Sequence, residues 1–280
     1  MSDPKILQLQ KDLLTLGFDP GKLDGLMGPK TRAALLDYVG GIGLDAGSVL
    51  NDPTRLHQEA EAKRATLALL PPVVPAGYLD LSERCTNTAW RKKDRPWSEI
   101  TGVTLHQTGC PMAENLERWL DLKAHYGVTY SGQLYRVHRE TDFGWHAQGL
   151  SHHEIGIEIA GLFLGVESDP KTRPGAPKSW ATQSITPAQV TATKDLIRYL
   201  VALVKYHGGA LTEIHAHRQG APKDDPKAGR KPDPGSKVWQ EVALPLMAEL
   251  GLSDGGPGWT LGKGEPIPEA WDSSRVGIKY

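Results

Sequence analysis

Residues 81–250 alternate between strand-like and helix-like segments, and this alternation restricts the fold more than any other feature of the sequence. The clearest strand is Glu154–Ala160, where isoleucine occupies every second position, the period of a strand. The clearest helix begins after Thr186, because Pro187 suits the first helical position and Gln189 completes a capping box. We therefore predict a mixed α/β domain over residues 81–250.

Three more segments of this region have the composition of strands. They are Gly102–His106, Gln133–His138 and Leu211–His217. The helix after Thr186 is expected to end at Gly208–Gly209, since glycine commonly terminates a helix.

The first 44 residues predict a separate helical domain. Leucines recur at helical spacing up to Gly17, where a residue free to adopt positive φ ends the first helix. A second helix starts at Pro29, and Gly40–Gly41 are expected to break the unit.

The remaining parts of the chain are expected to connect or to cover these two domains. Residues 45–80 are interpreted as a linker, with a polar helical segment at Pro53–Leu70 and a stiff spacer at Pro71–Pro75. Residues 251–280 are rich in glycine and proline and show no period, so we expect a tail that wraps the surface of the α/β domain.

Charge and composition exclude several classes of protein. The chain has 32 basic and 33 acidic side chains, so it lacks the basic excess typical of nucleic-acid binding. No apolar run approaches the length of a membrane-spanning helix, and the first residues do not resemble a secretory signal. Two cysteines cannot build a disulfide framework. We expect a monomer that neither binds nucleic acid nor inserts into a membrane.

Two histidines and one aspartate lie where functional groups usually gather. His106 and His217 each end a predicted strand, and Asp233 lies in a Pro-Asp-Pro-Gly turn. Two imidazoles and one carboxylate leave a fourth position for water, the composition of a catalytic zinc site. The spacing alone does not distinguish this site from ordinary core or surface histidines.

The amino-terminal residues resemble a known wall-binding family. The Asp24-Gly25 turn, the Gly28–Thr31 segment and the leucine spacing occur together within residues 5–40, as in the small three-helix peptidoglycan-binding domain. This resemblance implies that residues 1–44 bind peptidoglycan and perform no chemistry.

The α/β region resembles the zinc-dependent N-acetylmuramoyl-L-alanine amidases, which include phage endolysins and peptidoglycan recognition proteins. Five motifs that carry this resemblance occur in order within residues 95–245: Leu105–Thr108, Ala124–Tyr126, Gly144–Ala147, Ile155–Glu158 and Ala216–Gln219 with Asp233–Gly235. The resemblance implies a central mixed β-sheet flanked by helices. It also implies hydrolysis of the amide between N-acetylmuramic acid and the L-alanine of the stem peptide.

Roles for individual residues follow from the same resemblance. It implies that His106, His217 and Asp233 bind Zn²⁺ and that Glu158 is the catalytic general base. Lys231 matches a basic residue that stabilises the transition state. Four residues are expected at the walls of the substrate pocket: His125, Tyr126, Trp145 and His146.

The loop between His217 and Asp233 leaves a second alignment open. Asp225-Pro226 competes with Asp233-Pro234 as the ligand, and Lys223 would then replace Lys231. We prefer Asp233 because Gly235 and a helical stretch containing Trp239 follow it.

Two other side chains compete for a place in the site. His215 lies on the same strand face as His217, and Cys110 is close to His106 in sequence. The Arg218-Gln219 that follows favours His217, and Cys110 is interpreted as an inert thiol.

The sequence therefore predicts a modular, bacteriolytic peptidoglycan hydrolase that depends on zinc. A zinc peptidase cutting within the stem peptide and a non-catalytic peptidoglycan receptor are the alternatives. Without a secretory signal, the protein is expected to reach the wall from the cytoplasm, either as a phage endolysin or through a secretion system.

Overall fold

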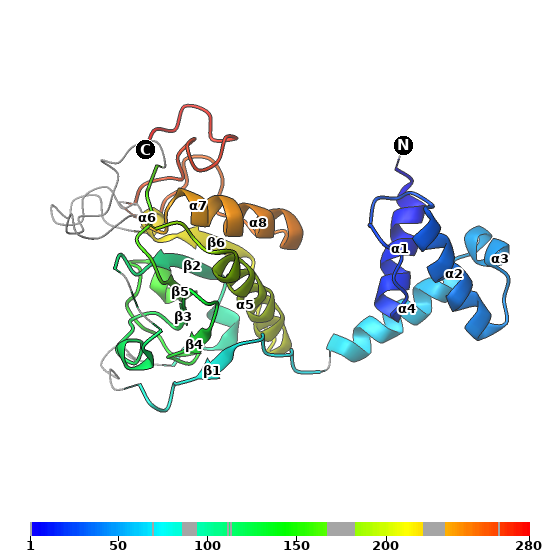
Figure 1. Cartoon of the computed structure of the whole chain (residues 1–280), viewed down its shortest axis with the longest axis horizontal. Helices are drawn as coiled ribbons and strands as arrows, with labels where there is room; N and C mark the ends of the chain where they lie inside the picture. The colour runs from blue at the N-terminus through cyan, green and yellow to red at the C-terminus, as the bar shows by residue number, and fades with distance from the viewer. Residues whose placement is uncertain are drawn as a thin grey trace. The chain divides into compact units, whose positions relative to one another are not determined.

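The computed structural model describes residues 2–68, 70–85, 94–110, 112, 114–166, 183–220, 233–262 and 264–280. The chain forms two compact units, residues 1–71 and 72–280, and each has its own hydrophobic core (Figure 1).

The first unit is helical. Its described residues form α1 (Pro4–Leu16), α2 (Pro29–Ile42), α3 (Ala46–Asn51) and α4 (Thr54–Ala68). As predicted, α1 ends at Gly17, whose φ is 100°, and Pro29 occupies the first turn of α2. The core joins all four helices, since Leu13, Leu35, Val49 and Leu56 belong to one buried cluster.

The first unit extends further along the chain than the predicted domain of residues 1–44. Gly40 and Gly41 lie inside α2, which ends at Gly43 instead, where φ is 70°. Beyond this cap, Val49 and Leu56 are 4% and 1% exposed and complete the core of the unit. The polar helical segment expected in the linker is therefore α4, packed within this unit.

The second unit is built on a six-stranded mixed sheet in the order β1-β4-β3-β5-β2-β6. The only antiparallel pair in this sheet is β3 with β4. The strands are β1 (Tyr78–Asp80), β2 (Gly102–Gln107), β3 (Tyr126–Val128), β4 (Leu134–Arg136), β5 (Glu154–Ile159) and β6 (Glu213–Ala216). The mixed α/β fold class predicted from the sequence is confirmed.

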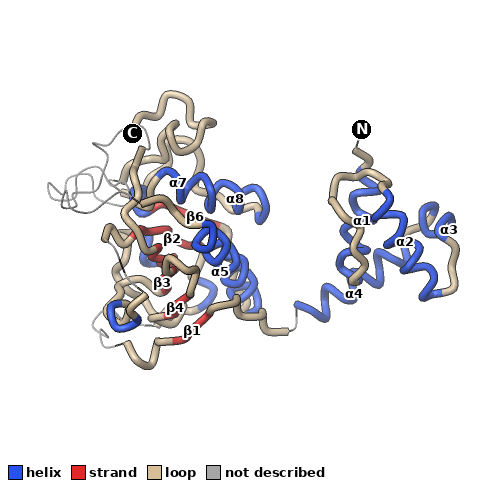
Figure 2. The backbone as a smooth tube through the Cα atoms, viewed as in Figure 1, coloured by secondary structure: helices blue, strands red, loops and turns tan. Residues whose placement is uncertain are grey.

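Helices and turns surround this sheet (Figure 2). The long helix α5 (Pro187–Tyr206) begins with the predicted capping box of Thr186 and Gln189. Near the end of the unit lie α6 (His217–Gly220), α7 (Ser236–Val238), a π-helical turn (Trp239–Ala243) and α8 (Leu244–Leu250). Short 3₁₀ turns span Trp97–Glu99, Leu116–Arg118 and Leu150–His152.

The two faces of the sheet differ in chemistry because side chains alternate along each strand. One face carries apolar residues such as Leu105, Ile157 and Ile214, which share one buried cluster with residues of α5 and of the α7–α8 stretch. The opposite face carries polar or small residues. On β2, β5 and β6 these are, in turn, Gly102, Thr104 and His106; Glu154, Gly156 and Glu158; and Glu213 and His215. The alternation in the sequence thus buries one face of the sheet in the core and places the ionisable side chains on the other.

None of the helices in the described ranges combines the length and hydrophobicity that a bilayer-spanning segment needs.

Candidate metal centre

The polar face of the sheet brings His106, His217 and Asp233 together. His106 is near the end of β2, and His217 is the first residue after β6, the neighbouring strand. The Nδ1 atoms of the two histidines are 3.0 Å apart. Asp233 Oδ2 lies 2.7 Å from Nδ1 of His217 and 3.6 Å from Nδ1 of His106. Three potential ligand atoms therefore converge on one point.

His146 determines which nitrogen of His106 faces that point. His146 Nε2 lies 3.1 Å from the carbonyl oxygen of Glu154, and its Nδ1 lies 3.1 Å from Nε2 of His106. Burial holds the pKa of His146 well below its usual value, so the ring is neutral and carries one N–H. That N–H must go to the carbonyl oxygen, so Nδ1 accepts a hydrogen bond from His106 Nε2. The lone pair of His106 Nδ1 is left facing His217 and Asp233.

A glycine makes this arrangement possible. A Cβ atom on Gly156 would lie 2.7 Å from the His146 ring, too close for any side chain without a shift of the ring. Gly156 on β5 therefore lets His146 pack against the polar face of the sheet.

Asp233 is held by backbone groups from two directions. Its Oδ1 accepts a hydrogen bond of 2.6 Å from the N–H of Gln107, and its carbonyl oxygen accepts one of 3.2 Å from the N–H of Arg218. Burial alone would raise the pKa of Asp233, but the neighbouring imidazoles of His106 and His217 hold it well below its usual range. The carboxylate is therefore ionised, as a metal ligand must be.

Gly235 lets the Asp233 turn approach the sheet. Its φ is 105°, which strains any other residue, and a Cβ atom there would lie 2.8 Å from Cβ of Phe163. The Gly235 that the sequence singled out after Asp233 thus has a steric role.

Glu158 lies beside this group on β5 and is the register partner of His106 on β2. Its Oε2 is buried and has no hydrogen-bond partner within the described residues. Burial raises the pKa of Glu158 well above its usual value, and the negative charge of Asp233 adds to the effect. A carboxyl with one buried, unpaired oxygen next to three ligand atoms is a candidate for proton transfer.

The group is open on one side. The side chain of His106 is 1% exposed, whereas those of His217 and Asp233 are 17% and 15% exposed. Two of the three candidate ligands therefore keep some exposure to solvent.

Of the four predicted pocket residues, only Trp145 is exposed, at 43%. His146 contacts His106, as described above. His125 and Tyr126 are 2% and 0% exposed, so neither side chain is accessible to a substrate in this structure.

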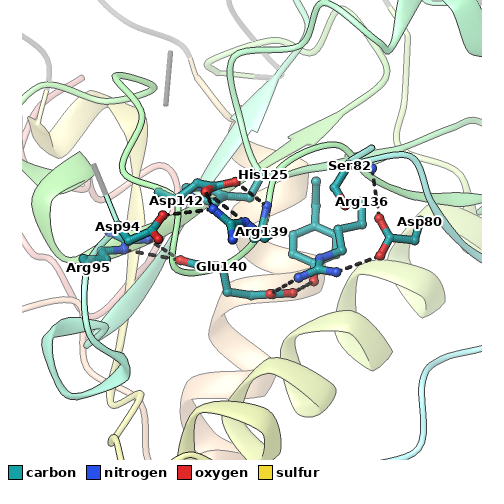
Figure 3. A network of polar contacts seen from close by, with 10 residues as sticks. Asp80, Ser82, Asp94, Arg95, His125, Arg136, Arg139, Glu140 and Asp142 are labelled. Atoms are coloured by element: carbon teal, nitrogen blue, oxygen red, sulfur yellow. Dashed lines mark hydrogen bonds and ion pairs between the residues drawn. The ribbon is translucent and has the colours of Figure 1, made fainter. Parts of the chain in front are cut away.

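A buried polar network holds His125 (Figure 3), and Tyr126 joins it through Glu140. The Nε2 of His125 lies 2.8 Å from the carbonyl oxygen of Asp142, and its Nδ1 accepts from the N–H of Gly156 at 3.0 Å. The Tyr126 hydroxyl donates to Glu140, which also pairs with Arg136 at 2.5 Å. Both side chains thus brace the sheet, and sequence motifs alone did not reveal this role.

A second cluster, Glu154, Glu213 and His215, lies at the opposite end of the same face. Glu154 accepts from His215 Nδ1 and from the Thr104 hydroxyl, each at 2.5 Å, and Thr101 donates to Glu213 at 2.9 Å. His215 therefore pairs with Glu154 and does not join His106. This observation agrees with the choice of His217 over His215.

Three residues of the predicted alignment cannot be compared with this geometry. Lys231, Asp225 and Lys223 lie outside the described residues. Cys110 is described, is partly exposed, and does not belong to either convergent group found in that part of the chain.

Two imidazoles and one carboxylate, side chains of metal-ligating type, thus converge on the polar face of a mixed α/β sheet. Residues 96–236 match the family model described as N-acetylmuramoyl-L-alanine amidase. The chain belongs to this family.

Comparison with solved structures finds similar proteins of low sequence identity. The amidase LysC from Clostridium intestinale is 18% identical, with a TM-score of 0.42, and the match covers 64% of this chain and 100% of LysC. The Ph2119 endolysin from a Thermus scotoductus bacteriophage is 18% identical, with a TM-score of 0.37. The match covers 63% of this chain and 99% of the endolysin. A Drosophila PGRP-LB variant in complex with tracheal cytotoxin is 17% identical, with a TM-score of 0.39. The match covers 63% of this chain and 96% of PGRP-LB. No curated protein matches the sequence.

Proposed function

We propose that this protein hydrolyses the amide between N-acetylmuramic acid and L-alanine in peptidoglycan, using a zinc ion held by His106, His217 and Asp233. The convergence of these three side chains within a member of the amidase family carries the proposal.

The donor set suits zinc in chemistry and in spacing. Two imidazoles and one carboxylate are typical of catalytic zinc sites, which leave one position open. Ligand atoms around a tetrahedral zinc ion lie roughly 3.3 Å apart, because Zn–N and Zn–O bonds are about 2.0–2.1 Å long. The three separations here, 3.0, 2.7 and 3.6 Å, bracket that value. When bound, the metal would polarise the scissile carbonyl and lower the pKa of a water molecule.

Glu158 is the proposed general base. Its carboxyl lacks a hydrogen-bond partner within the described residues, so it is free to take the proton of the attacking water. The group would regain its negative charge once a dication occupies the neighbouring site, since an opposite charge lowers a carboxyl pKa. Glu158 would then deliver the proton to the leaving amine of L-alanine.

Lys231 is the proposed partner of the oxyanion that forms on the scissile carbonyl. It lies two residues before Asp233 in sequence, and a cation near developing negative charge lowers the barrier. Trp145, the exposed aromatic residue next to His146, is the proposed contact for the sugar or peptide of the substrate.

The first unit is proposed to bind the cell wall. It contains a cavity of about 330 Å³ between α1 and the α3–α4 region, within the range of small-ligand pockets. Its lining combines apolar Leu9 and Val49 with polar Asp12, Asn51 and His57. Such a mixture suits a glycan or a peptide, which have both apolar and hydrogen-bonding groups. A wall-binding unit also favours an enzyme that meets intact wall, as an endolysin or a delivered lytic effector does.

Digestion of purified sacculi tests the proposed reaction. We expect new L-alanine amino termini together with free lactyl carboxyl groups, detected by mass spectrometry of the products. New amino groups elsewhere in the stem peptide would identify a peptidase instead. Binding of sacculi without any new termini would identify a receptor.

A further inference from the structure

The segment after α8, Leu252–Tyr280, folds onto the second unit although it lies beyond the family match at residues 96–236. It has almost no regular secondary structure, yet Ile267 and Trp271 are 3% and 0% exposed and belong to the main core. The Trp271 indole N–H donates to the carbonyl oxygen of Gly165, in the stretch that follows β5. This segment is therefore part of the domain and does more than cover it.

Arg218, directly after the candidate ligand His217, is enclosed by this segment. The Arg218 side chain is 1% exposed, and its Nη2 lies 3.1 Å from Oε2 of Glu265. Its guanidinium carbon lies 5.1 Å from the ring centre of Trp271 and 4.7 Å from that of Tyr280. A buried cation needs such partners, since its loss of hydration must be offset. All three come from the C-terminal segment.

The backbone of Arg218 links the same segment to the other candidate ligand. The Arg218 N–H donates to the carbonyl oxygen of Asp233, and the Arg218 carbonyl oxygen accepts from the N–H of Glu265 at 2.8 Å. One peptide therefore contacts Asp233 on one side and the C-terminal segment on the other.

The next residue repeats this pattern. The carbonyl oxygen of Gln219 accepts from the N–H of Leu261 at 2.9 Å, and its side-chain amide donates to the carbonyl oxygen of Asp254 at 3.0 Å. The Gln219 side-chain oxygen also accepts from the N–H of Ala216, the residue before His217. The short turn that presents His217 is thus hydrogen-bonded to the C-terminal segment at two successive residues.

We propose that the C-terminal segment, acting through Arg218, is a positioning element of the metal centre and sets its affinity for zinc. Arg218 does not touch the convergent ligand atoms. It fixes the turn that carries His217 and the backbone of Asp233, and Glu265 fixes Arg218. The inference rests on the proposed zinc site but not on which amide is cleaved.

Two substitutions in the full-length protein test the inference. Arg218→Lys keeps the charge but loses the planar fork, and Glu265→Gln removes the charged partner from the segment. Groups that support metal ligands typically contribute 10–100-fold to metal affinity. We expect each variant to bind zinc about tenfold or more weakly than the wild type, measured by competition with a chromophoric chelator. The visible spectrum of the cobalt-loaded Arg218→Lys protein should also change, because the ligand geometry changes.

Arg275→Lys is the matched control. Arg275 is a buried arginine within the C-terminal segment, 6% exposed, and its side chain pairs with the carboxylates of Asp254 and Asp272, whereas the turn at His217 is contacted by the backbone carbonyl of Asp254. We expect this variant to keep wild-type zinc affinity and cobalt spectrum, even if metal-free Arg275→Lys and Arg218→Lys melt at similar temperatures.

Wild-type affinity in Arg218→Lys overturns the inference, and so does an equal loss of affinity in Arg275→Lys. These results leave the proposed function intact, because they compare variants of a protein that binds zinc. Failure of the wild type to bind zinc overturns the proposed function itself. Zinc binding without release of lactyl carboxyl groups rejects only the proposed reaction.

Discussion

His106 and Glu158 are register partners on the adjacent parallel strands β2 and β5. Both belong to the polar face of the sheet, so their separation is determined by the hydrogen-bonded strands and not by a loop. A candidate metal ligand and a candidate base are therefore held on neighbouring interior strands of the sheet. Such placement suits catalysis, because even small errors in the position of the reacting groups slow a reaction.

Glu158→Gln should separate proton transfer from metal binding. The amide keeps the size of the side chain but cannot accept the proton of water, so we expect turnover to fall by roughly 10²–10⁴-fold. Zinc content, measured by elemental analysis after dialysis, should stay at the wild-type level. Glu213→Gln, which removes a carboxylate from the far end of the same face, is the control and should retain activity. Loss of zinc from Glu158→Gln would make Glu158 a ligand.

Substitution of the proposed ligands should remove the metal itself. His217→Ala and Asp233→Ala each delete one of three protein ligands, so we expect both to lose zinc on dialysis and to lose activity with it. The wild type should lose activity with a strong chelator and regain it with zinc.

Asp225→Ala tests the alternative alignment of the loop before Asp233. It should retain zinc, because the carboxylate that lies beside both histidines is that of Asp233. Loss of zinc from Asp225→Ala together with retention by Asp233→Ala would reverse the assignment and make Lys223 the proposed oxyanion partner.

The sequence predicted those parts of the fold that depend on local pattern. The four expected strands became β2, β4, β5 and β6, and the capping box at Thr186 is present, since alternation and caps are encoded in neighbouring residues. The strands β1 and β3 were missed because three residues alone show no period, and unlike β4 they were not recognised within a longer strand-like run such as Gln133–His138. Strand β1 also lies within the expected linker and gains its structure from pairing with β4.

For the candidate site, too, local sequence patterns could be predicted and contacts between distant residues could not. His106, His217 and Asp233 stood out through sequence motifs. The role of His146, in contrast, depends on its contact with the ring of His106, which comes from a distant part of the chain. Nothing in the Gly- and Pro-rich stretch after α8 predicted that Trp271 is fully buried, because that burial comes from contacts distant in sequence.

Removal of the first unit should weaken wall binding but not chemistry. Deletion of residues 1–71 removes the whole unit, so we expect binding to sacculi to fall on the order of 10–100-fold through lost avidity. Turnover of a small soluble muropeptide should change by less than about threefold, because a substrate that does not carry several binding sites gains nothing from avidity. Loss of soluble-substrate turnover would show that the first unit completes the active site.

Deletion of residues 1–44 should behave differently from deletion of residues 1–71. It removes α1 and α2 but leaves Val49 and Leu56 without the core that buries them. We expect this shorter deletion to aggregate, measured by light scattering, since newly exposed apolar surface promotes association. A monomeric, stable product would place the domain boundary at residue 44.

Ionised Asp272 should stabilise the second unit, and the unit should lose this contribution in acid. Burial alone would raise the pKa of Asp272, but hydrogen bonds from the Ser274 hydroxyl and N–H and from Arg275 lower it below its usual value. A carboxyl whose pKa is lower in the folded than in the unfolded chain stabilises the fold above the unfolded value of about 3.9. That contribution is lost as pH falls through the folded pKa.

The variant Asp272→Asn isolates this contribution. At pH 7 we expect its free energy of unfolding to be lower than that of the wild type by about 1.5–3 kcal/mol, the range for hydrogen bonds to a charged group. The difference should shrink below about pH 4, where Asp272 of the unfolded chain takes up a proton, and it should be lost once pH passes the lower pKa of the folded protein. All 8 tryptophans lie beyond residue 71, so their fluorescence in urea follows only the second unit. A stability difference that stays constant or grows as pH falls would mean that the charge of Asp272 does not stabilise the C-terminal segment.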